Sequence, residues 1–170
     1  NAREVSPNPS GGLSTEHFQI EIEKSIPDGS GDDQADITYF QTGTPATGAI
    51  ESVDLSSLAA AGVLDGAAAT LANVKGIVLR NNSDDVLYLG GGSGGKTTPN
   101  GDAWSDTDAG VTGSPFLVDG DVVTVPAGGA FVWTAPEGVD VVNTTAESFG
   151  IEQGAAAAGD YDLMIWGDSV

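Results

Sequence analysis

The amino-acid sequence predicts an all-β protein, an antiparallel β-sandwich of jelly-roll type with one short helix and an extended N-terminal arm. About ten short apolar runs recur at the spacing that is typical of strands in sandwiches and barrels. Turn-forming residues are frequent, with 25 glycines and 8 prolines among 170 residues. No segment shows the alternation of strand and helix patterns of α/β proteins. The length favours one domain, so we divide the chain into an arm, residues 1–15, and a single sandwich domain, residues 16–170.

The N-terminal elements are an arm and a strand. Prolines and a Gly-Gly pair exclude regular structure from the arm. Apolar and polar residues then alternate strictly over residues 18–23, which predicts a half-buried strand. Its apolar residues, Phe18, Ile20 and Ile22, are expected on an inner face of the sandwich, as are Leu163 and Ile165 near the C-terminus.

Residues 54–73 are the one helical candidate, with Asp54 as the N-cap. Gly62 and Gly66 interrupt the pattern, so only a short helix is expected. The remaining runs predict strands over residues 36–41, 49–53, 74–80, 86–89, 116–118, 122–125, 130–134, 139–142, 148–152 and 161–166. Short polar or Gly-rich turns predict that 74–80 pairs with 86–89 in a hairpin, and that 122–125 pairs with 130–134.

The charge balance excludes several classes of partner. The chain has 25 acidic and 5 basic residues, and its formal net charge is −20. Nucleic acid and anionic membrane surfaces both bind through Lys and Arg, so neither is an expected partner. No apolar run approaches the length of a transmembrane helix. With no cysteine and one histidine, His17, the composition points away from an enzyme.

The excess of acidic residues also indicates the salt concentration of the protein's environment. Seventeen aspartates and eight glutamates stand against three lysines and two arginines. Repulsion at this charge density destabilises a compact state unless salt screens it. Proteins of salt-loving organisms have such surfaces, and an acidic extracellular protein of ordinary salt is the alternative.

One segment matches the phosphate-binding loop pattern, Gly90 to Thr97. The match needs a helix directly after the loop, with its N-terminus facing the phosphates. The next residues, Thr98 to Asp102, include Pro-Asn-Gly and do not continue a helix. We therefore interpret the segment as a Gly-rich loop that binds no nucleotide.

Two Asp-rich loops are the candidate cation sites. Asp28, Asp32 and Asp36 alternate with other residues in the way that calcium loops place their oxygen ligands. Two departures from the EF-hand are Asp33 at the position of the turn glycine and Tyr39 at that of the bidentate glutamate. A second oxygen-rich stretch comprises Asn100, Asp102, Asp106 and Asp108. Calcium or another cation is the only cofactor that the sequence suggests, and solvated loop acids are the simpler interpretation.

Tryptophans are the other residues singled out by type. Trp133 and Trp166 lie in predicted strands and are expected in the core or an interface. Trp104 lies in a Gly- and Asp-rich loop. We expect it to be buried in the core or against a partner, with stacking on a sugar ring as the alternative.

Three segments carry a resemblance to a known family. They read VKGIVLRNN running into LYLGG, then VPAGGAF, then YDLMIWG, within residues 74–167. This order of strands and turns resembles small β-sandwich virion proteins of tailed viruses, of the capsid-decoration or head-fibre type. The resemblance covers about 95 residues and includes neither residues 1–73 nor the acidic surplus.

The resemblance implies a structural protein of the virion, with no catalytic residues. Its partners would be the major capsid protein or other virion proteins and its own copies, with a trimer favoured. The location would be the extracellular particle, in a high-salt environment if the acidity has the meaning given above. The alternative function is a secreted β-sandwich module that binds carbohydrate or a cell surface, with or without calcium.

The net charge leads to one prediction about thermal stability. Raising NaCl from low to molar concentration at pH near 7 should raise the melting temperature, because salt shortens the Debye length to about 3 Å and screens the carboxylates. A thermal melt followed by circular dichroism at each salt concentration measures this. A flat or falling curve would contradict adaptation to high salt.

Overall fold

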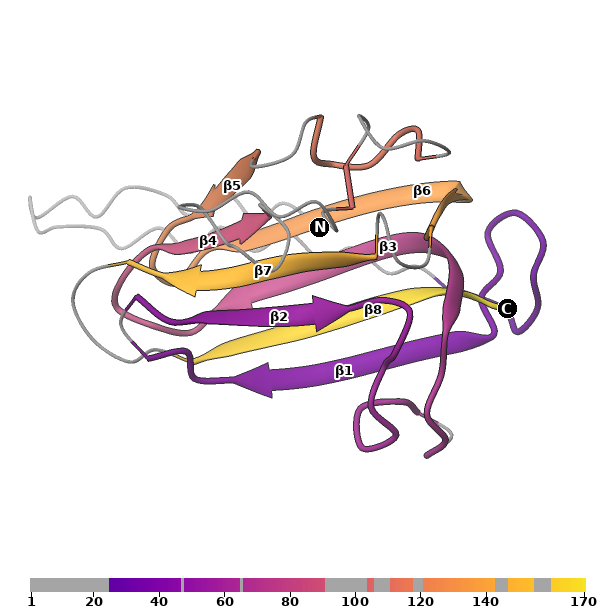
Figure 1. Cartoon of the computed structure of the whole chain (residues 1–170), viewed down its shortest axis with the longest axis horizontal. Helices are drawn as coiled ribbons and strands as arrows, with labels where there is room; N and C mark the ends of the chain where they lie inside the picture. Colours follow the sequence, from indigo (N-terminus) through magenta and orange to yellow (C-terminus); the bar gives the residue numbers. More distant parts are fainter. Residues whose placement is uncertain are drawn as a thin grey trace, which may run out of the picture.

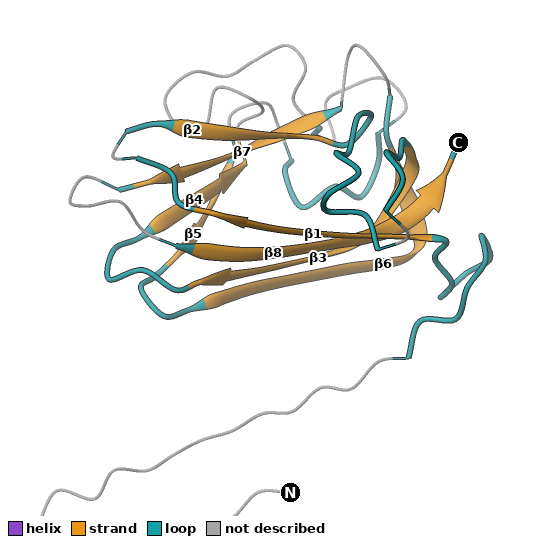
Figure 2. Ribbon diagram, turned by 90° about the horizontal axis from the view of Figure 1, so that it is seen from below, coloured by secondary structure: helices purple, strands orange, loops and turns teal. Residues whose placement is uncertain are grey.

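The computed structural model has two stacked four-stranded antiparallel sheets. It describes residues 25–46, 48–64, 66–90, 104–105, 111–117, 121–142, 147–154 and 160–170. Sheet I has the order β1-β8-β3-β6 and sheet II the order β2-β7-β4-β5. The strands are β1 (Ile37–Gly43), β2 (Ile50–Asp54), β3 (Leu71–Asn81), β4 (Leu87–Gly90), β5 (Val122–Val125), β6 (Ala130–Asp140), β7 (Ser148–Gln153) and β8 (Tyr161–Ser169). Figures 1 and 2 show the sheets as two layers of a sandwich-like arrangement, which confirms the predicted all-β antiparallel class.

The strand pairs are nested along the sequence. β1 pairs with β8, β2 with β7, β3 with β6 and β4 with β5. Further pairs, β3 with β8 and β4 with β7, complete the two sheets. Among the described strands, only β4 and β5 follow each other in the sequence and lie in the same sheet. Both predicted hairpins are therefore wrong, because β3 and β4 lie in different sheets, and so do β5 and β6.

A buried amide explains why the chain changes sheet at these two points. Asn81, at the end of β3, is fully buried. Its Nδ2 donates toward the carbonyl oxygens of Asp85, Val125 and Pro126, at 2.7, 3.0 and 3.1 Å. Its Oδ1 accepts hydrogen bonds from the backbone N–H and the hydroxyl of Ser83, at 2.9 and 2.6 Å. One side chain thus holds the β3–β4 and β5–β6 connections together where they pass between the sheets.

The core lies between the two sheets. Alternate residues of each strand point inward, as the period of a half-buried strand requires. The predicted inner residues Leu163 and Ile165 are 2% and 0% exposed, which confirms that expectation. The largest fully buried side chains are Trp104, Tyr161, Phe149, Leu55, Leu58, Leu71, Ile77, Leu79, Leu87, Leu89, Ile151 and Leu163.

The predicted helix is wrong, since the described part of residues 54–73 contains none. Asp54 does accept a hydrogen bond from the N–H of Ser56, at 2.9 Å, but this closes a turn. Leu58 and Ala69 then exchange two backbone hydrogen bonds, of 2.8 and 3.1 Å, which takes the donors that a helix would use. Leu58 is only 2% exposed, so it is buried in the core although this segment is not helical.

Other segments also differ from the sequence-based expectations. Residues 116–117 of the predicted strand 116–118 are irregular, although Phe116 is buried. The strand predicted over 130–134 and the first half of the strand predicted over 139–142 belong to one element, β6, in which Gly138 has a φ of 87°. The arm and the strand predicted over 18–23 lie outside the described residues. No described helix is long and apolar enough to cross a membrane.

Replacing Asn81 by Asp tests the role of the buried amide. The carboxylate would face three carbonyl oxygens in the interior, and we expect a loss of unfolding free energy of about 3 kcal/mol or more at pH 7. Burial raises the pKa of such a carboxyl above that of the unfolded chain, so the loss should shrink as pH falls toward 4. Urea unfolding of mutant and wild type at both pH values measures the difference. Asn82→Asp, at the exposed neighbouring position, is the control: it removes a hydrogen bond to Asp162 and adds a repulsion that water screens, so it should cost far less.

Candidate functional site

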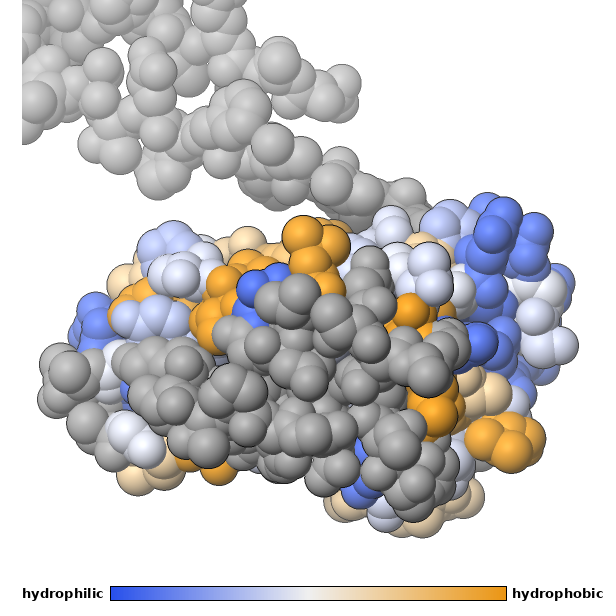
Figure 3. Space-filling view, turned by 45° about the horizontal axis from the view of Figure 1, so that its top comes forward, coloured by the Kyte–Doolittle hydropathy of each residue, from blue (hydrophilic) through white to orange (hydrophobic). Residues whose placement is uncertain are grey.

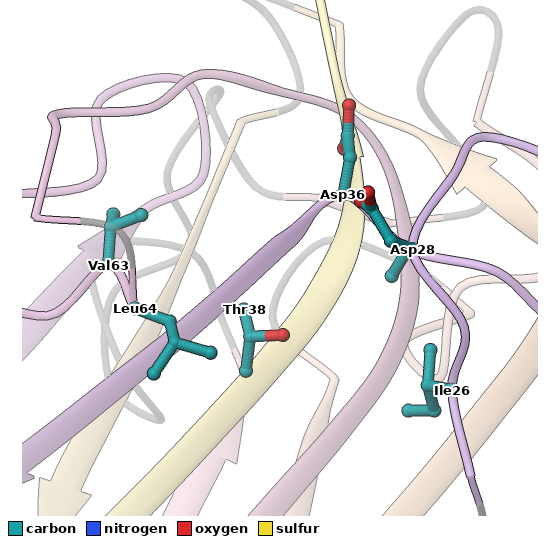
Figure 4. A pocket seen from close by; sticks show the side chains of 7 residues that line it. Ile26, Asp28, Asp36, Thr38, Val63 and Leu64 are labelled. Carbon is teal, nitrogen blue, oxygen red and sulfur yellow. The ribbon is translucent and has the colours of Figure 1, made fainter.

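The Asp-rich loop lies at one end of the sandwich, before β1. Asp28 and Asp36 line an open hollow of about 280 Å³, together with apolar residues that include Ile26 and Leu64. Figure 4 shows the two carboxylates on one side of this hollow and Leu64 on the other. Both oxygens of Asp36 are used, since they accept hydrogen bonds from the N–H and hydroxyl of Ser169 at 2.7 and 2.6 Å. Asp36 therefore fastens the end of β8 to the start of β1, and Asp32 does not line the hollow.

The carbonyl oxygens of this loop already surround a cation, the ammonium of Lys75. This side chain leaves β3 at a bulge and is 2% exposed. Its Nζ lies 2.7 Å from Gly31 O, 2.9 Å from Gln34 O and 3.4 Å from Ser30 O. It also forms an ion pair of 2.8 Å with Asp168.

A metal ion bound in this loop would need a different arrangement of ligating side chains. Among the residues that the structure describes, no three His, Cys, Asp or Glu side chains lie close enough to share one. The strongly hydrophilic end of the molecule on the right of Figure 3 corresponds to the end where Figure 1 places this loop. The loop thus works as a covering element fastened from within by Lys75.

The other residues singled out in the sequence divide into two groups. Trp104 is 1% exposed, and its Nε1 donates to the carbonyl of Asp140 at 2.8 Å. Its ring meets those of Trp133 and Phe116 edge to face, at centroid distances of 5.5 and 6.3 Å. This confirms the expected core role and removes Trp104 as a stacking platform for a sugar. The second group lies outside the described residues and comprises His17, Asn100, Asp102, Asp106, Asp108 and the phosphate-loop match beyond Gly90.

A polar hollow at the opposite end of the sandwich was not anticipated from the sequence. It measures about 550 Å³ and is lined by Thr42, Gly43, Thr44, Glu51, Asn82, Asp160, Tyr161 and Asp162. Two carboxylates on its wall are held by neighbouring groups. The hydroxyl of Thr44 donates to Asp160 and the amide of Asn82 donates to Asp162, both at 2.7 Å. The hollow therefore presents fixed hydrogen-bond acceptors to a ligand.

A chain of hydrogen bonds joins the two sheets and reaches the wall of this hollow at Tyr161 and Glu51. The Tyr39 hydroxyl donates to Gln41 Oε1 at 3.0 Å, and Gln41 Nε2 donates to the Tyr161 hydroxyl at 2.7 Å. The Tyr161 hydroxyl donates to Glu51 Oε2 on β2 at 2.5 Å. Gly43 allows this close approach, because a Cβ there would overlap the Glu51 carboxylate and the Tyr161 ring.

The environment keeps both phenols protonated. Burial, and then the hydrogen bond and negative charge of Glu51, raise the pKa of Tyr161 far above its usual value of 10. Burial alone raises the pKa of Tyr39. Tyr161 is thus a permanent donor to Glu51 at neutral pH and is not placed to accept a proton.

Comparison with known proteins gives no relative: no family model, no curated protein and no solved structure matches this chain.

Replacing Tyr161 by Phe tests the bridge through its pH dependence. Above pH 10 the unfolded chain releases the Tyr161 proton while the folded chain retains it, so wild-type stability should fall by up to about 1.4 kcal/mol per pH unit from this group. The mutant should be less stable at pH 7, by about 1–3 kcal/mol, since Glu51 and Gln41 lose their partner. Its decline above pH 10 should be shallower than that of wild type. Unfolding in urea from pH 7 to 11 measures both effects.

Tyr39→Phe is the control for this comparison. It keeps the bond between Tyr161 and Glu51, so the alkaline loss that Tyr161 causes should persist. Equal slopes for Tyr161→Phe and wild type above pH 10 would show that Tyr161 is not held protonated in the folded state.

Proposed function

We propose that this protein is a structural component of a virion, a capsid-decoration or other minor capsid-associated protein that binds the shell and its own copies. The observation that carries the proposal is the outer edge of β6 over residues 130–134, with which no described residue pairs. We place the protein on the extracellular particle, in a high-salt environment, without catalytic activity. The proposal is consistent with the strand and turn order in residues 74–167.

We infer that the connectivity is that of a jelly roll. The strands pair in a nested order, with β4 and β5 at the tip. One long two-stranded antiparallel ribbon gives this order when it is rolled up so that its strand pairs fall into two sheets. Jelly rolls build viral capsid proteins and also lectins, so this topology is compatible with a virion protein and with a carbohydrate-binding module. The fold alone does not choose between them.

The outer edge of β6 is the feature that supports the virion function. Asn81 N–H donates to Gly129 O at 2.9 Å, and hydrogen-bonded positions alternate along an antiparallel pair. The backbone groups of Phe131 and Trp133 therefore point toward β3, and those of Ala130, Val132 and Thr134 point away from the sheet. No residue of the described part pairs with this outer side. The edge ends at Pro136, whose carbonyl accepts a hydrogen bond from Asp33 at 3.2 Å.

Over residues 130–134 this edge lacks the usual protection against association, which begins only at Pro136. Soluble proteins place charged residues, prolines or covering loops on exposed edges. The other edge of sheet I, β1, is covered in this way: Phe40 N–H donates to Gly62 O at 2.7 Å, and Leu64 N–H donates to Thr38 O at 2.9 Å. Residues 130–134 carry no charge. An uncharged open edge beside a covered one is what a subunit that adds strands from its neighbours would present.

The assembly that we propose is a homo-oligomer, a trimer, seated on the capsid shell. Residues 1–15 are too polar to form a core of their own, and in this proposal they bind a neighbour. The trimer comes from the family resemblance alone.

A secreted carbohydrate-binding module is the second candidate, and the polar hollow is the observation that favours it. Carboxylate and hydroxyl groups such as Glu51 and Thr44 are suitable partners for sugar hydroxyls. However, the one aromatic residue of its lining, Tyr161, is 0% exposed and offers no ring face for stacking. This places the sugar-binding function second.

Light scattering in molar NaCl tests the role of the edge. Wild type should have three times the mass of the chain, and Thr134→Lys should lower that mass toward one chain, because a charged edge residue opposes strand pairing. Thr124→Lys, at an exposed position on the edge strand of sheet II, is the matched control and should leave the trimer intact.

Co-sedimentation with virus particles tests attachment. Deletion of residues 1–15 should leave the sandwich folded but reduce the bound fraction. A strict monomer that never sediments with particles would remove the virion function. Retention on a polysaccharide column, lost on adding a chelator, would favour the secreted module.

A further inference from the structure

The described part of the chain leaves an apolar surface open beside β1, on the outer face of sheet I. Leu64 is 75% and Phe40 is 48% exposed, although both are large apolar side chains. Strand register continues this surface from Phe40 to Met164 on β8 and then to Val78 on β3. A contiguous exposed apolar surface of this kind marks a place where another molecule binds.

The exposed Leu64 is held in position by β1. Its backbone N–H donates to Thr38 O at 2.9 Å. Val63, the residue before it, forms a β-bridge with Tyr39 and is 5% exposed. The backbone of Leu64 is therefore fixed by the fold itself, and a partner that covers its side chain has no loop to order first.

A hollow beside Leu64 combines an apolar wall with two carboxylates. Its volume is about 280 Å³, and its apolar groups come from Ile26, Ala35, Val63 and Leu64. Figure 4 shows Leu64 on one side of the hollow and Asp28 and Asp36 on another. A hollow of this size is smaller than most sites for small molecules, but it admits one long side chain.

Both carboxylates can accept further hydrogen bonds. Asp28 is exposed, and no described residue forms a hydrogen bond or an ion pair with it. Each oxygen of Asp36 accepts one hydrogen bond from Ser169, and a carboxylate oxygen has about two acceptor positions. No basic side chain of the described part lines the hollow, so its acidic side has no positive partner there.

The apolar wall and the two carboxylates together select the chemistry of the occupant. A lysine side chain has a flexible apolar stem, which packs on apolar surface, and a terminal ammonium with three donors. In this hollow the stem would lie against Leu64, and the ammonium would reach Asp28 and Asp36. A neutral apolar side chain would leave the carboxylates facing it without a partner.

A second copy of this chain is a poor source of that side chain. Only five of its residues are basic, and those in the described part are Lys75, which is 2% exposed, and Arg80. The net charge of −20 also opposes the approach of another copy to an acidic hollow and favours a basic partner. The occupant is therefore a different protein, and apolar residues beside its lysine would cover Leu64 and Phe40.

We propose that this hollow is the docking site for a lysine side chain of a different protein, with the ammonium at Asp28 and Asp36 and apolar neighbours on Leu64 and Phe40. The inference does not depend on the proposed virion function, because it defines the partner only by its chemistry. The site lies at the β1 edge of sheet I, and β6 forms the opposite edge. It is therefore a second contact surface, separate from the open edge of β6.

A short peptide tests the site directly. Acetyl-Leu-Lys-Leu-amide is titrated into isotope-labelled protein, and the backbone amide signals are followed by NMR. The signals of Thr38 and Leu64 should shift in a saturable way. The same peptide with Nε-acetyl-lysine is the matched control, and it should bind roughly tenfold more weakly because it has no ammonium. Equal affinity of the two peptides, or saturable shifts confined to other residues, would overturn the proposal.

Asp28→Asn tests the contribution of the hollow against that of the net charge. This variant removes no hydrogen bond within the described part, so circular dichroism should be unchanged, and the lysine peptide should bind roughly fivefold more weakly. Asp84→Asn, in the exposed turn after β3, changes the net charge by the same amount and should leave the affinity unchanged. Equal losses in the two variants would overturn the proposal, because the attraction would then come from the charge of the whole molecule.

Leu64→Ser tests the apolar wall in the same titration. It should weaken binding of the lysine peptide roughly threefold, because the stem and the flanking leucines lose apolar contact. Leu117→Ser is the matched control, since Leu117 is 66% exposed and does not line the hollow. Equal affinities of these two variants would show that the apolar wall does not take part and would overturn the proposed occupant.

Two further measurements separate the other occupants. n-Butylamine that binds as tightly as the lysine peptide would overturn a protein partner in favour of a small amine. A shift of the Thr38 signal on raising the protein concentration alone, absent in Arg80→Gln, would overturn it in favour of a second copy. We expect neither result, because butylamine cannot cover Leu64 and Phe40 together and the chain repels its own copies.

Discussion

The buried amide of Asn81 joins the parts of the chain that make two sheets out of one ribbon. An ordinary turn after β3 would return the chain beside the strand it had just formed. Here the carbonyl groups of the following turn and of the β5–β6 turn all point at one side chain, so both turns are directed across the sandwich. An amide suits this position because it supplies two N–H groups and an acceptor without charge. The sheet-changing connections, and with them the nested pairing, are held at this point.

The interior position of Lys75 shows how an acidic chain uses a rare cation. Only five residues are basic, and Lys75, with Arg80, is one of two in the described part. Removing an ammonium and a carboxylate from water costs several kcal/mol per ion, so the pair with Asp168 is a poor source of stability by itself. Its contribution is specificity, since three loop carbonyls have one position in which they satisfy the ammonium. The loop before β1 is thereby fixed on the outer face of sheet I.

Local patterns predicted most strands but not their partners. The alternation around Leu163 and Ile165 was sufficient to place their side chains in the core. By contrast, a polar turn between two apolar runs predicts a hairpin whether or not the chain changes sheet. The one local sign of the crossing is Asn81 itself, a polar residue at the inward position that follows Ile77 and Leu79. The predicted helix was wrong for a related reason. Leu58 pairs with Ala69, and local helix propensity does not include a contact with a residue so much further along the chain.

The same limit applies to the candidate sites: their local spacing is visible in the sequence, whereas contacts between distant residues are not. The Asp-rich loop was found from its spacing, but the cation at its carbonyls comes from Lys75, more than forty residues later in the chain. The polar hollow has no local signature, since Glu51 and Tyr161 are separated by 110 residues and meet only after both sheets form.

The central place of β8 in sheet I has a consequence for how the protein is made. β8 is the last described strand in the sequence, yet it lies between β1 and β3. During synthesis β1 and β3 leave the ribosome well before the neighbour that they share. The described part of sheet I can therefore close only once β8 has been made, and β1 stays unpaired with its main partner until then. Pairing of such long sequence separation folds slowly and leaves strand edges available to wrong partners meanwhile. For a nascent chain in this position, strong mutual repulsion between carboxylates is an advantage, because it keeps incomplete copies apart until the last strand arrives.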